Sequence, residues 1–271
     1  MDVQAYFDRI GFTGSARADL ETLTALHRLH LRAIPYENFD VLLHRPVSIA
    51  PDAAFEKLVT RRRGGWCYEM NGLLGVVLED IGFSVTRMAG AVMRAERGDV
   101  SLGNHLVLRV DLDRPYIADV GFGDGILEPF PLAFGAHRCA GYEFRLEDLG
   151  DTWLRFHNQD QGGAPYFDFR LEPAKADQLS ATCQWLASSA DSIFTQTALG
   201  FRHTDDGIVG LLGRTVRRVQ PGRKSTELIN SADEFIAVLQ HEFDLDIPEA
   251  AQLWPTICAK HDQLFSQSSS G

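Results

Sequence analysis

Apolar residues in the first part of the chain recur at the spacing of an α-helix. Leucine occurs at every third position from Leu20 to Leu29. Phe55 and Leu58 repeat this spacing after a loop that carries two prolines. Residues 1–85 are therefore predicted to be mainly helical.

The clearest helix of this part follows a pair of glycines. From Met70 to Ile81 the apolar residues trace one face of a helix, and Gly82 is a natural left-handed cap at its end. Cys67 is then expected in the first turn of that helix.

From about residue 86 to residue 190 the apolar period changes to two, which is typical of half-buried strands. Residues 105–110 and 116–120 alternate in this way, and similar runs follow at 141–146 and 152–156. Short strands in close succession predict an antiparallel meander or a small barrel.

The last part of the chain mixes short apolar stretches with one clear helix. Ser231 and Glu234 have the spacing of a capping box, and Phe235 and Leu239 follow at helical spacing. The pattern thus divides the chain into three parts, which we expect to be domains: 1–85, 86–190 and 191–271.

The composition is that of an ordinary globular protein, with 45% hydrophobic and 23% charged residues. The formal net charge of −11 argues against nucleic-acid binding, so an anionic ligand needs a local basic patch. The N-terminus lacks the features of a secretory signal, and no stretch approaches the roughly 18 apolar residues of a membrane span. We therefore expect a cytoplasmic protein without membrane contact, either a monomer or a homodimer.

The four cysteines lie far apart with no CxxC pair, so reduced thiols are expected. Cys67 differs from the others because it follows two glycines at the positive end of a helix, where reactive cysteines are usually found. We interpret the other cysteines and three of the histidines as structural: Cys139, Cys183, Cys258, His137, His157 and His203.

The helix end alone does not ionise this thiol. A free cysteine with a pKa near 8.5 is only about 3% thiolate at pH 7, and a helix end contributes at most about 2 kcal/mol. A positioned imidazole has to supply the rest by accepting the proton. His105 has the best surroundings for this role, because the neighbouring strand carries a lone carboxylate, Asp119, among apolar residues.

The relative position of His105 and Asp119 depends on the hairpin loop between their strands. With a three-residue loop, Asp111 faces Pro115. Val107 then faces Asp119, and His105 is a diagonal neighbour on the same face, about 7 to 8 Å away at Cα. A two-residue loop would put the two side chains on opposite faces, so the hypothesis of a Cys–His–Asp triad makes a geometric prediction.

Each of these residues also has an ordinary explanation. A cysteine near a helix start is often a small buried hydrophobe, a strand histidine is often structural, and an aspartate before a glycine often serves a turn. Thiolate, imidazole and carboxylate are also zinc ligands, but the close-spaced ligand pairs common in zinc sites are missing, so no metal is expected. From the pattern alone, the triad and the structural interpretation both stay open.

Three segments resemble the motifs of the arylamine N-acetyltransferase family in its bacterial form. Residues 63–71 (RGGWCYEMN) resemble its active-site signature, 34–40 (IPYENFD) its N-terminal motif, and 119–123 (DVGFG) the segment with its third triad member. The order of cysteine, histidine and aspartate also matches. Met70 departs from the family, which commonly has glutamine there, and we expect altered packing without loss of the chemistry.

The resemblance spans nearly the whole chain and implies an α+β fold with a cysteine-protease-like catalytic core. An N-terminal helical bundle, an antiparallel β-barrel and a C-terminal α/β lid are the implied parts. Cys67 is the implied nucleophile, His105 the base and Asp119 the orienting acid. The family's ping-pong reaction moves an acetyl group from acetyl-CoA through the cysteine to an arylamine or hydrazine, so acetyl-CoA is a co-substrate and no metal takes part.

The expected substrate contacts lie on either side of the triad residues. Phe122 and Gly123 stand in a Gly-rich loop, where an aromatic face can meet an aryl ring, although a plain tight turn is an equal alternative. Ser101 and Leu102 match a family position near CoA. No P-loop sequence is present for the CoA phosphates. Two basic clusters remain, which we expect to be mainly solvated surface: 61–63 and 214–224.

A triad of this kind does not specify the acyl acceptor, so two other functions stay open. The same three residue types serve in hydrolases and in transglutaminase-like amidotransferases. A non-catalytic protein that binds aromatic ligands on the same fold would need no reactive thiol. The reactivity of Cys67 and the identity of the acceptor separate these hypotheses.

Overall fold

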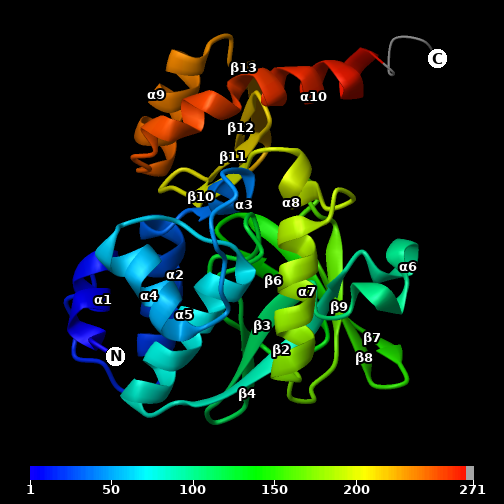
Figure 1. The fold of residues 1–271 in the computed structure, drawn as a ribbon. Coiled ribbons are helices and arrows are strands. Elements are labelled where there is room, and N and C mark those ends of the chain that lie inside the picture. The colour runs from blue at the N-terminus through cyan, green and yellow to red at the C-terminus, as the bar shows by residue number, and fades with distance from the viewer. Residues whose placement is uncertain (267–271) are drawn as a thin grey trace.

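The structure is a computed structural model that describes residues 1–266. Helices form most of the N-terminal part, and they pack beside a β-barrel (Figure 1). The predicted helices around Leu23 and Leu73 are confirmed. The elements are α1 (Val3–Ile10), α2 (Leu20–Ala33), α3 (Phe39–Leu42), α4 (Pro51–Phe55), the π-helical turn η1 (Glu56–Thr60) and α5 (Cys67–Ile81).

Helix α5 is the centre of the N-terminal core. Most of its residues from Cys67 to Leu78 are buried, and it contacts strands of the barrel. Gly82 ends the helix with a φ of 110°, as its position predicts. Met70 has no exposed surface and packs in an apolar cluster, where a glutamine would need a buried hydrogen-bond partner.

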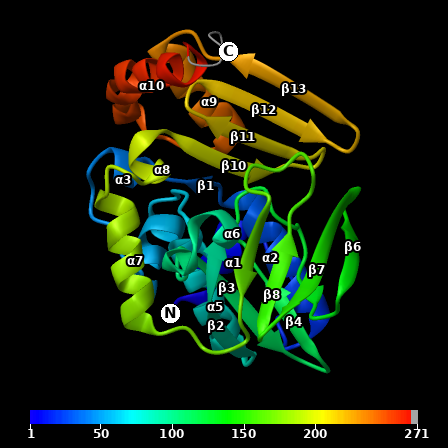
Figure 2. The ribbon, with the colours of Figure 1, turned by 90° about the vertical axis from the view of Figure 1, so that its right-hand side faces the viewer.

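An eight-stranded antiparallel sheet curls into a nearly closed barrel, which confirms the strand pattern (Figure 1, Figure 2). The strand order is β5-β4-β3-β2-β9-β8-β7-β6. The strands are β2 (Ser84–Val92), β3 (His105–Asp111), β4 (Pro115–Ala118), β5 (Phe130–Pro131), β6 (Gly135–Cys139), β7 (Tyr142–Gly150), β8 (Trp153–His157) and β9 (Tyr166–Phe169). Two short helical turns lie between β2 and β3: α6 (Arg94–Arg97) and η2 (Asp99–Ser101).

The β3–β4 hairpin has the register on which the triad hypothesis depends. Asp111 pairs with Pro115 and Leu108 pairs with Ala118, which confirms the three-residue loop. Asp119 follows directly after the last paired residue. The hairpin therefore presents its acid on the same face as the histidine that begins β3.

Two segments differ from the predicted pattern. Tyr36–Glu37, expected within the helical part, forms strand β1 and joins the C-terminal sheet. A strand of this length shows no period. Residues 176–188, expected among strands, form helix α7 (Ala176–Ser188). Its buried residues Leu179, Cys183 and Leu186 have helical spacing, but the exposed apolar residues Ala181 and Trp185 lie between them and weaken the pattern.

The C-terminal part is a second antiparallel sheet with the order β1-β10-β11-β12-β13 (Figure 2). Phe235 and Leu239 of α9 belong to its apolar core. Ser231 caps this helix, because its hydroxyl accepts from the Glu234 N–H at 3.1 Å, but the predicted capping box is only half formed: the Glu234 carboxylate accepts from the Asn230 N–H at 2.8 Å and not from that of Ser231. The elements are α8 (Ile193–Gln196), β10 (Leu199–His203), β11 (Ile208–Leu212), β12 (Thr215–Gln220), β13 (Arg223–Leu228), α9 (Ala232–Phe243), the 3₁₀ turn η3 (Pro248–Leu253) and α10 (Trp254–Ser266). None of the helices in residues 1–266 combines the length and the apolar run needed to cross a bilayer.

Five charged side chains are buried together beside the first turn of α5. Lys57 Nζ lies 2.9 Å from both carboxylate oxygens of Glu69 and 3.0 Å from Asp40. Arg63 lies 2.7 Å from Glu37 and 3.1 Å from Asp40. Burial alone would lower the pKa of Lys57, but the surrounding carboxylates raise it above its usual range. This ion cluster joins β1, α3, η1 and α5 at the point where the helix begins.

Replacement of Lys57 by methionine tests the ion cluster. The variant leaves the carboxylates of Glu69 and Asp40 buried without their shared cation, and breaking a buried ion pair costs about 3–5 kcal/mol. We therefore expect the free energy of unfolding in urea to fall by about 3 kcal/mol. Lys175→Met, at an exposed position before α7, is the control and should change the same quantity by less than about 0.5 kcal/mol. Equal stability of the two variants would contradict the role of the cluster.

Candidate active site

Cys67 is the first residue of α5, and two glycines bring the chain to it. A Cβ on Gly64 would lie 2.3 Å from the carbonyl oxygen of Pro35, and one on Gly65 would lie 2.8 Å from Oε2 of Glu69. Close packing against the neighbouring backbone and the helix therefore requires both glycines. The thiol-bearing residue itself is buried, with 3% of its surface exposed.

His105 and Asp119 form a direct hydrogen bond at the end of the β3–β4 hairpin. Nε2 of the histidine lies 2.7 Å from Oδ2 of the aspartate, and both side chains are buried. Burial alone would lower the pKa of His105, but Asp119 and, to a smaller extent, Cys67 raise it to about 10. Burial alone would raise the pKa of Asp119, and His105 holds it below its ordinary value. The imidazole is therefore protonated at neutral pH beside an ionised carboxylate.

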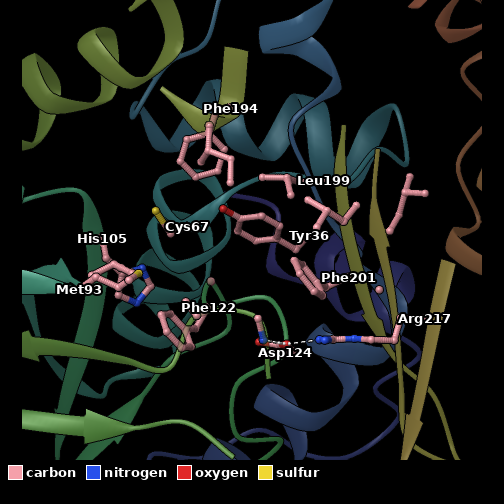
Figure 3. Close-up of a pocket in the computed structure, with 18 of the residues that line it drawn as sticks. Tyr36, Cys67, Met93, His105, Phe122, Asp124, Phe194, Leu199, Phe201 and Arg217 are labelled. Carbon is pink, nitrogen blue, oxygen red and sulfur yellow. Dashed lines mark hydrogen bonds and ion pairs between the residues drawn. The ribbon is translucent and has the colours of Figure 1, made fainter. Parts of the chain in front are cut away.

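The second ring nitrogen of His105 is available to the thiol of Cys67. Nε2 is bound to Asp119, which leaves Nδ1 for Cys67. Figure 3 shows the Cys67 sulfur beside the His105 ring at one side of a cavity. The nearby Cys67 side chain contributes to the raised pKa of His105, after Asp119. An imidazolium next to a thiol favours the thiolate, so the structure brings together the three residues of the triad hypothesis.

Asn71, one turn into α5, holds the acid in place. Its Nδ2 donates to Oδ1 of Asp119 at 2.8 Å, and its Oδ1 accepts from the Val120 N–H at 2.9 Å. The Gly121 N–H donates to the same Asp119 oxygen at 2.9 Å. A Cβ on Gly121 would lie 2.6 Å from Cα of Cys67, so only glycine lets this loop approach the nucleophile helix so closely.

Cys67 and His105 line a cavity of about 420 Å³ between the barrel and the C-terminal sheet (Figure 3). The Phe122 ring lies 5.4 Å from the His105 ring, centre to centre. Much of the wall is aromatic or aliphatic and comes from all three parts of the chain: Tyr36, Phe122, Phe194, Leu199, Phe201 and Leu211. A cavity of this kind is typical of a small-molecule site.

Four charged side chains besides His105 interrupt the apolar wall. Asp124 is 2% exposed and accepts from the Gly163 N–H at 2.5 Å. Burial is the main reason that its pKa is raised. Arg217 Nη2 lies 3.5 Å from Asp124 Oδ2, and Arg97 and Lys224 also line the cavity. The cavity wall therefore carries three cations in a chain of net charge −11, of which Arg217 is paired with Asp124.

The residues predicted to contact substrate are not all on the cavity wall. Phe122 lines the cavity. Gly123 has a φ of +77°, and a Cβ there would lie 2.8 Å from the Phe201 ring, so backbone geometry requires this glycine. Ser101 donates its hydroxyl to a carbonyl within its own turn, and the Leu102 carbonyl accepts from α7. Of the four predicted contacts, Gly123, Ser101 and Leu102 thus do not line the cavity.

The two predicted basic clusters separate in the structure. Arg217 and Lys224 line the cavity, whereas Arg218 is paired with carboxylates of β13 and α9. In the other cluster, Arg63 is buried in the ion cluster beside α5. The expectation of mainly solvated surface is wrong for Arg217 and Arg63, because carboxylates distant in the sequence pair with them, whereas Lys224 is exposed at the edge of the cavity.

Tyr36, Asp124 and Arg97 are among the cavity residues that sequence reasoning missed. Tyr36 stands in a motif and Asp124 directly follows another, so both carried a signal. Arg97 stands in a polar run without any pattern. Within residues 1–266, no group of three His, Cys, Asp or Glu side chains is arranged to hold a metal ion.

Comparisons with known proteins agree with this geometry. Residues 19–252 match a family model described as N-acetyltransferase. The chain is 36% identical to the arylamine N-acetyltransferase of Mycolicibacterium smegmatis, over 93% of this chain and 94% of that protein. It is 34% identical to the arylamine N-acetyltransferase of Escherichia coli strain K12, over 90% of this chain and 89% of that protein. The solved structure of Mycobacterium marinum arylamine N-acetyltransferase in complex with CoA superposes with a TM-score of 0.86, at 29% identity and over 97% and 99% of the two chains.

Replacement of Asp119 by asparagine tests the ion pair. Without this carboxylate, burial dominates and lowers the pKa of His105, so the Cys67 thiolate loses its cation. A free thiol with a pKa of about 8.5 is only about 0.3% ionised at pH 6. We expect iodoacetamide to alkylate Cys67 at pH 6 at least about tenfold more slowly in Asp119→Asn than in the wild type, followed by intact mass.

Asp111→Asn is the matched control. This carboxylate ends β3, the strand that His105 begins, and it pairs with Arg109. It should leave the alkylation rate unchanged. Equal rates for Asp119→Asn and the wild type from pH 5 to pH 8 would contradict the ion pair.

Proposed function

This chain belongs to the arylamine N-acetyltransferase family, and we propose that it moves an acetyl group from acetyl-CoA to arylamines and hydrazines through a thioester on Cys67. The family makes the protein an acyltransferase whose reaction depends on acetyl-CoA. The observation that carries the assignment of Cys67 is the 2.7 Å hydrogen bond between His105 and Asp119 beside the thiol.

The first half of the reaction uses the Cys67 thiolate as the nucleophile. Its electron pair forms a bond to the thioester carbon of acetyl-CoA, and the carbonyl π electrons move to the oxygen. When this tetrahedral species collapses, the bond from carbon to the CoA sulfur breaks. CoA takes a proton from the His105 imidazolium and leaves as a thiol. The products are acetylated Cys67 and a neutral imidazole.

The second half returns the proton. The lone pair of the amine attacks the acetyl carbon, and the neutral His105 accepts a proton from the amine nitrogen. Collapse breaks the bond to sulfur, which releases the N-acetylated product and the Cys67 thiolate. Asp119 stabilises the imidazolium at the beginning and the end of the cycle, so the ion pair is restored.

The size of the cavity supports a reaction in two steps. A volume of about 420 Å³ is near the lower end of the roughly 300–1,000 Å³ that hold one drug-sized ligand. The acetylated arm of CoA and an aryl acceptor therefore occupy it in turn, as a ping-pong mechanism requires. The rings of Phe122, Phe194 and Phe201 offer faces and edges to an aromatic acceptor.

Arg217 and Lys224 support a place for the anionic part of CoA. Both side chains line the same cavity as Cys67, and they come from the neighbouring strands β12 and β13. Guanidinium and ammonium groups bind phosphate through charge-assisted hydrogen bonds. We assign the CoA phosphates to the side of the cavity formed by these two strands and the thioester to the end at Cys67.

Incubation with acetyl-CoA should add one acetyl group to the intact protein, measured by mass spectrometry. Cys67→Ala should remain unmodified. Cys183→Ala is the control, because burial raises the pKa of the Cys183 thiol to about 12 and keeps it un-ionised, so this variant should still form the adduct. Addition of an aniline should discharge the adduct. Discharge at the same rate without amine would indicate a hydrolase, and an unmodified wild type would refute the acetylated cysteine.

Replacement of Lys224 by alanine tests the place of the phosphates. One lost charge-assisted hydrogen bond, partly screened by water, predicts a three- to tenfold increase of KM for acetyl-CoA, roughly, with little change of kcat. S-acetyl-N-acetylcysteamine carries the same thioester without phosphates and should show no difference between variant and wild type. Lys175→Ala is the control. An equal loss with both thioesters would contradict the assignment.

A further inference from the structure

A second buried histidine contacts the triad acid through its backbone. His27 lies on α2 and has no exposed surface. Its Nε2 lies 3.1 Å from the backbone nitrogen of Asp119, and its Nδ1 lies 2.9 Å from the carbonyl oxygen of Leu127. The two ring nitrogens therefore hold both ends of the segment 119–127.

The segment 119–127 meets both the nucleophile and the cavity. It begins with Asp119, passes Gly121 against Cys67, and places Phe122 and Asp124 in the cavity wall. The segment has no regular secondary structure, so no strand ladder or helix fixes its backbone. Its position depends on contacts made one by one from other elements.

Both contacts together permit a single state of the His27 ring. A backbone N–H only donates and a backbone carbonyl only accepts, so Nδ1 carries the hydrogen and Nε2 offers its lone pair. Burial lowers the pKa of His27 to about 4. The hydrogen bonds to Leu127 and Asp119 and the charge of Asp119 raise this pKa, but by less than burial lowers it. The titratable groups that interact with the ring are Asp119, His30 and His203, and burial lowers the pKa of both other histidines to about 3. The ring is thus neutral at ordinary pH.

We propose that His27 is a positioning residue for acetyl transfer, which as a neutral Nδ1–H imidazole fixes the backbone of Asp119 so that its carboxylate stays in line with His105. The proposal rests on the triad proposed above. Asn71, Gly121 and His105 restrain the carboxylate oxygens of Asp119. His27 accepts the hydrogen bond of the main-chain N–H, which these partners leave free.

Two amide variants separate the two contacts of His27. In His27→Gln, Oε1 takes the place of Nε2 and accepts from the Asp119 N–H. In His27→Asn, Nδ2 takes the place of Nδ1 and donates to Leu127, which leaves the Asp119 N–H buried without an acceptor. The asparagine variant therefore tests the contact to the acid, and the glutamine variant tests the contact to the other end of the segment.

We expect His27→Asn to lose about tenfold in the rate of Cys67 alkylation at pH 6 and in the single-turnover rate of acetylation. His27→Gln should stay within about threefold of the wild type in both rates. A role in helix packing alone would lower the unfolding temperature of both variants alike and leave the pH profile of the thiol unchanged. A wild-type profile in His27→Asn, or a larger loss in His27→Gln, would overturn the proposal.

His30→Gln is the matched control, because this histidine lies on the same buried face of α2 and contacts the Tyr6 hydroxyl. Its pH profile of alkylation should equal that of the wild type. Absence of an acetyl adduct in the wild type would refute the proposed acetyl transfer. The alkylation profiles do not depend on acetyl transfer, so they test the role of His27 separately.

If the His27 variants do not fold, ¹⁵N NMR of the wild-type imidazoles at pH 7 tests the proposal by measuring which nitrogen of His27 is protonated. One buried ring is expected to be protonated at Nδ1 and unprotonated at Nε2, within hydrogen-bond range of the Asp119 N–H. A His27 ring protonated at Nε2 would overturn the proposal.

Discussion

The buried negative charge of Asp119 is the constraint around which the site is organised. A carboxylate taken out of water is costly unless it is paired and its oxygens accept hydrogen bonds. His105 satisfies one oxygen, and Asn71 and Gly121 satisfy the other. These partners come from β3, from α5 and from the loop after β4. To satisfy one charge, the chain therefore fixes the nucleophile helix against the barrel.

The same charge determines the state of the imidazole. Burial alone would favour a neutral ring. Asp119 holds the pKa of His105 at about 10, which is above its unfolded value of about 6.5. The stabilising contribution of His105 is therefore full below pH 6.5 and is lost as the pH rises through 10. The pKa of Asp119 is lowered in the folded protein. The stabilising contribution of Asp119 is therefore lost only as the pH falls below the ordinary titration range of an aspartate. Between these limits the ion pair persists.

The sequence was sufficient for features that depend on local period and register. Parity across a three-residue loop placed His105 and Asp119 on one face, and Gly82 marked the end of α5. Strand β1 was missed, because Tyr36–Glu37 is too short to show a period and its partner β10 lies in the last part of the chain. The contact of His27 with the acid was missed for a related reason. It joins elements that are distant in the sequence, and a periodic pattern encodes only which face of a helix is buried.

The cavity wall and the geometry of the triad share the segment 119–127. Phe122 and Asp124 line the cavity, and Gly121 leaves no room for a Cβ against Cys67. A ligand that displaces Phe122 therefore acts on Asp119 through a short stretch of backbone. In the reaction proposed above, Cys67 is a nucleophile toward one substrate and a leaving group toward the next, and both roles need the imidazole at the same place. A segment anchored at both ends keeps the acid, and hence the imidazole, in position while the ligand in the cavity changes.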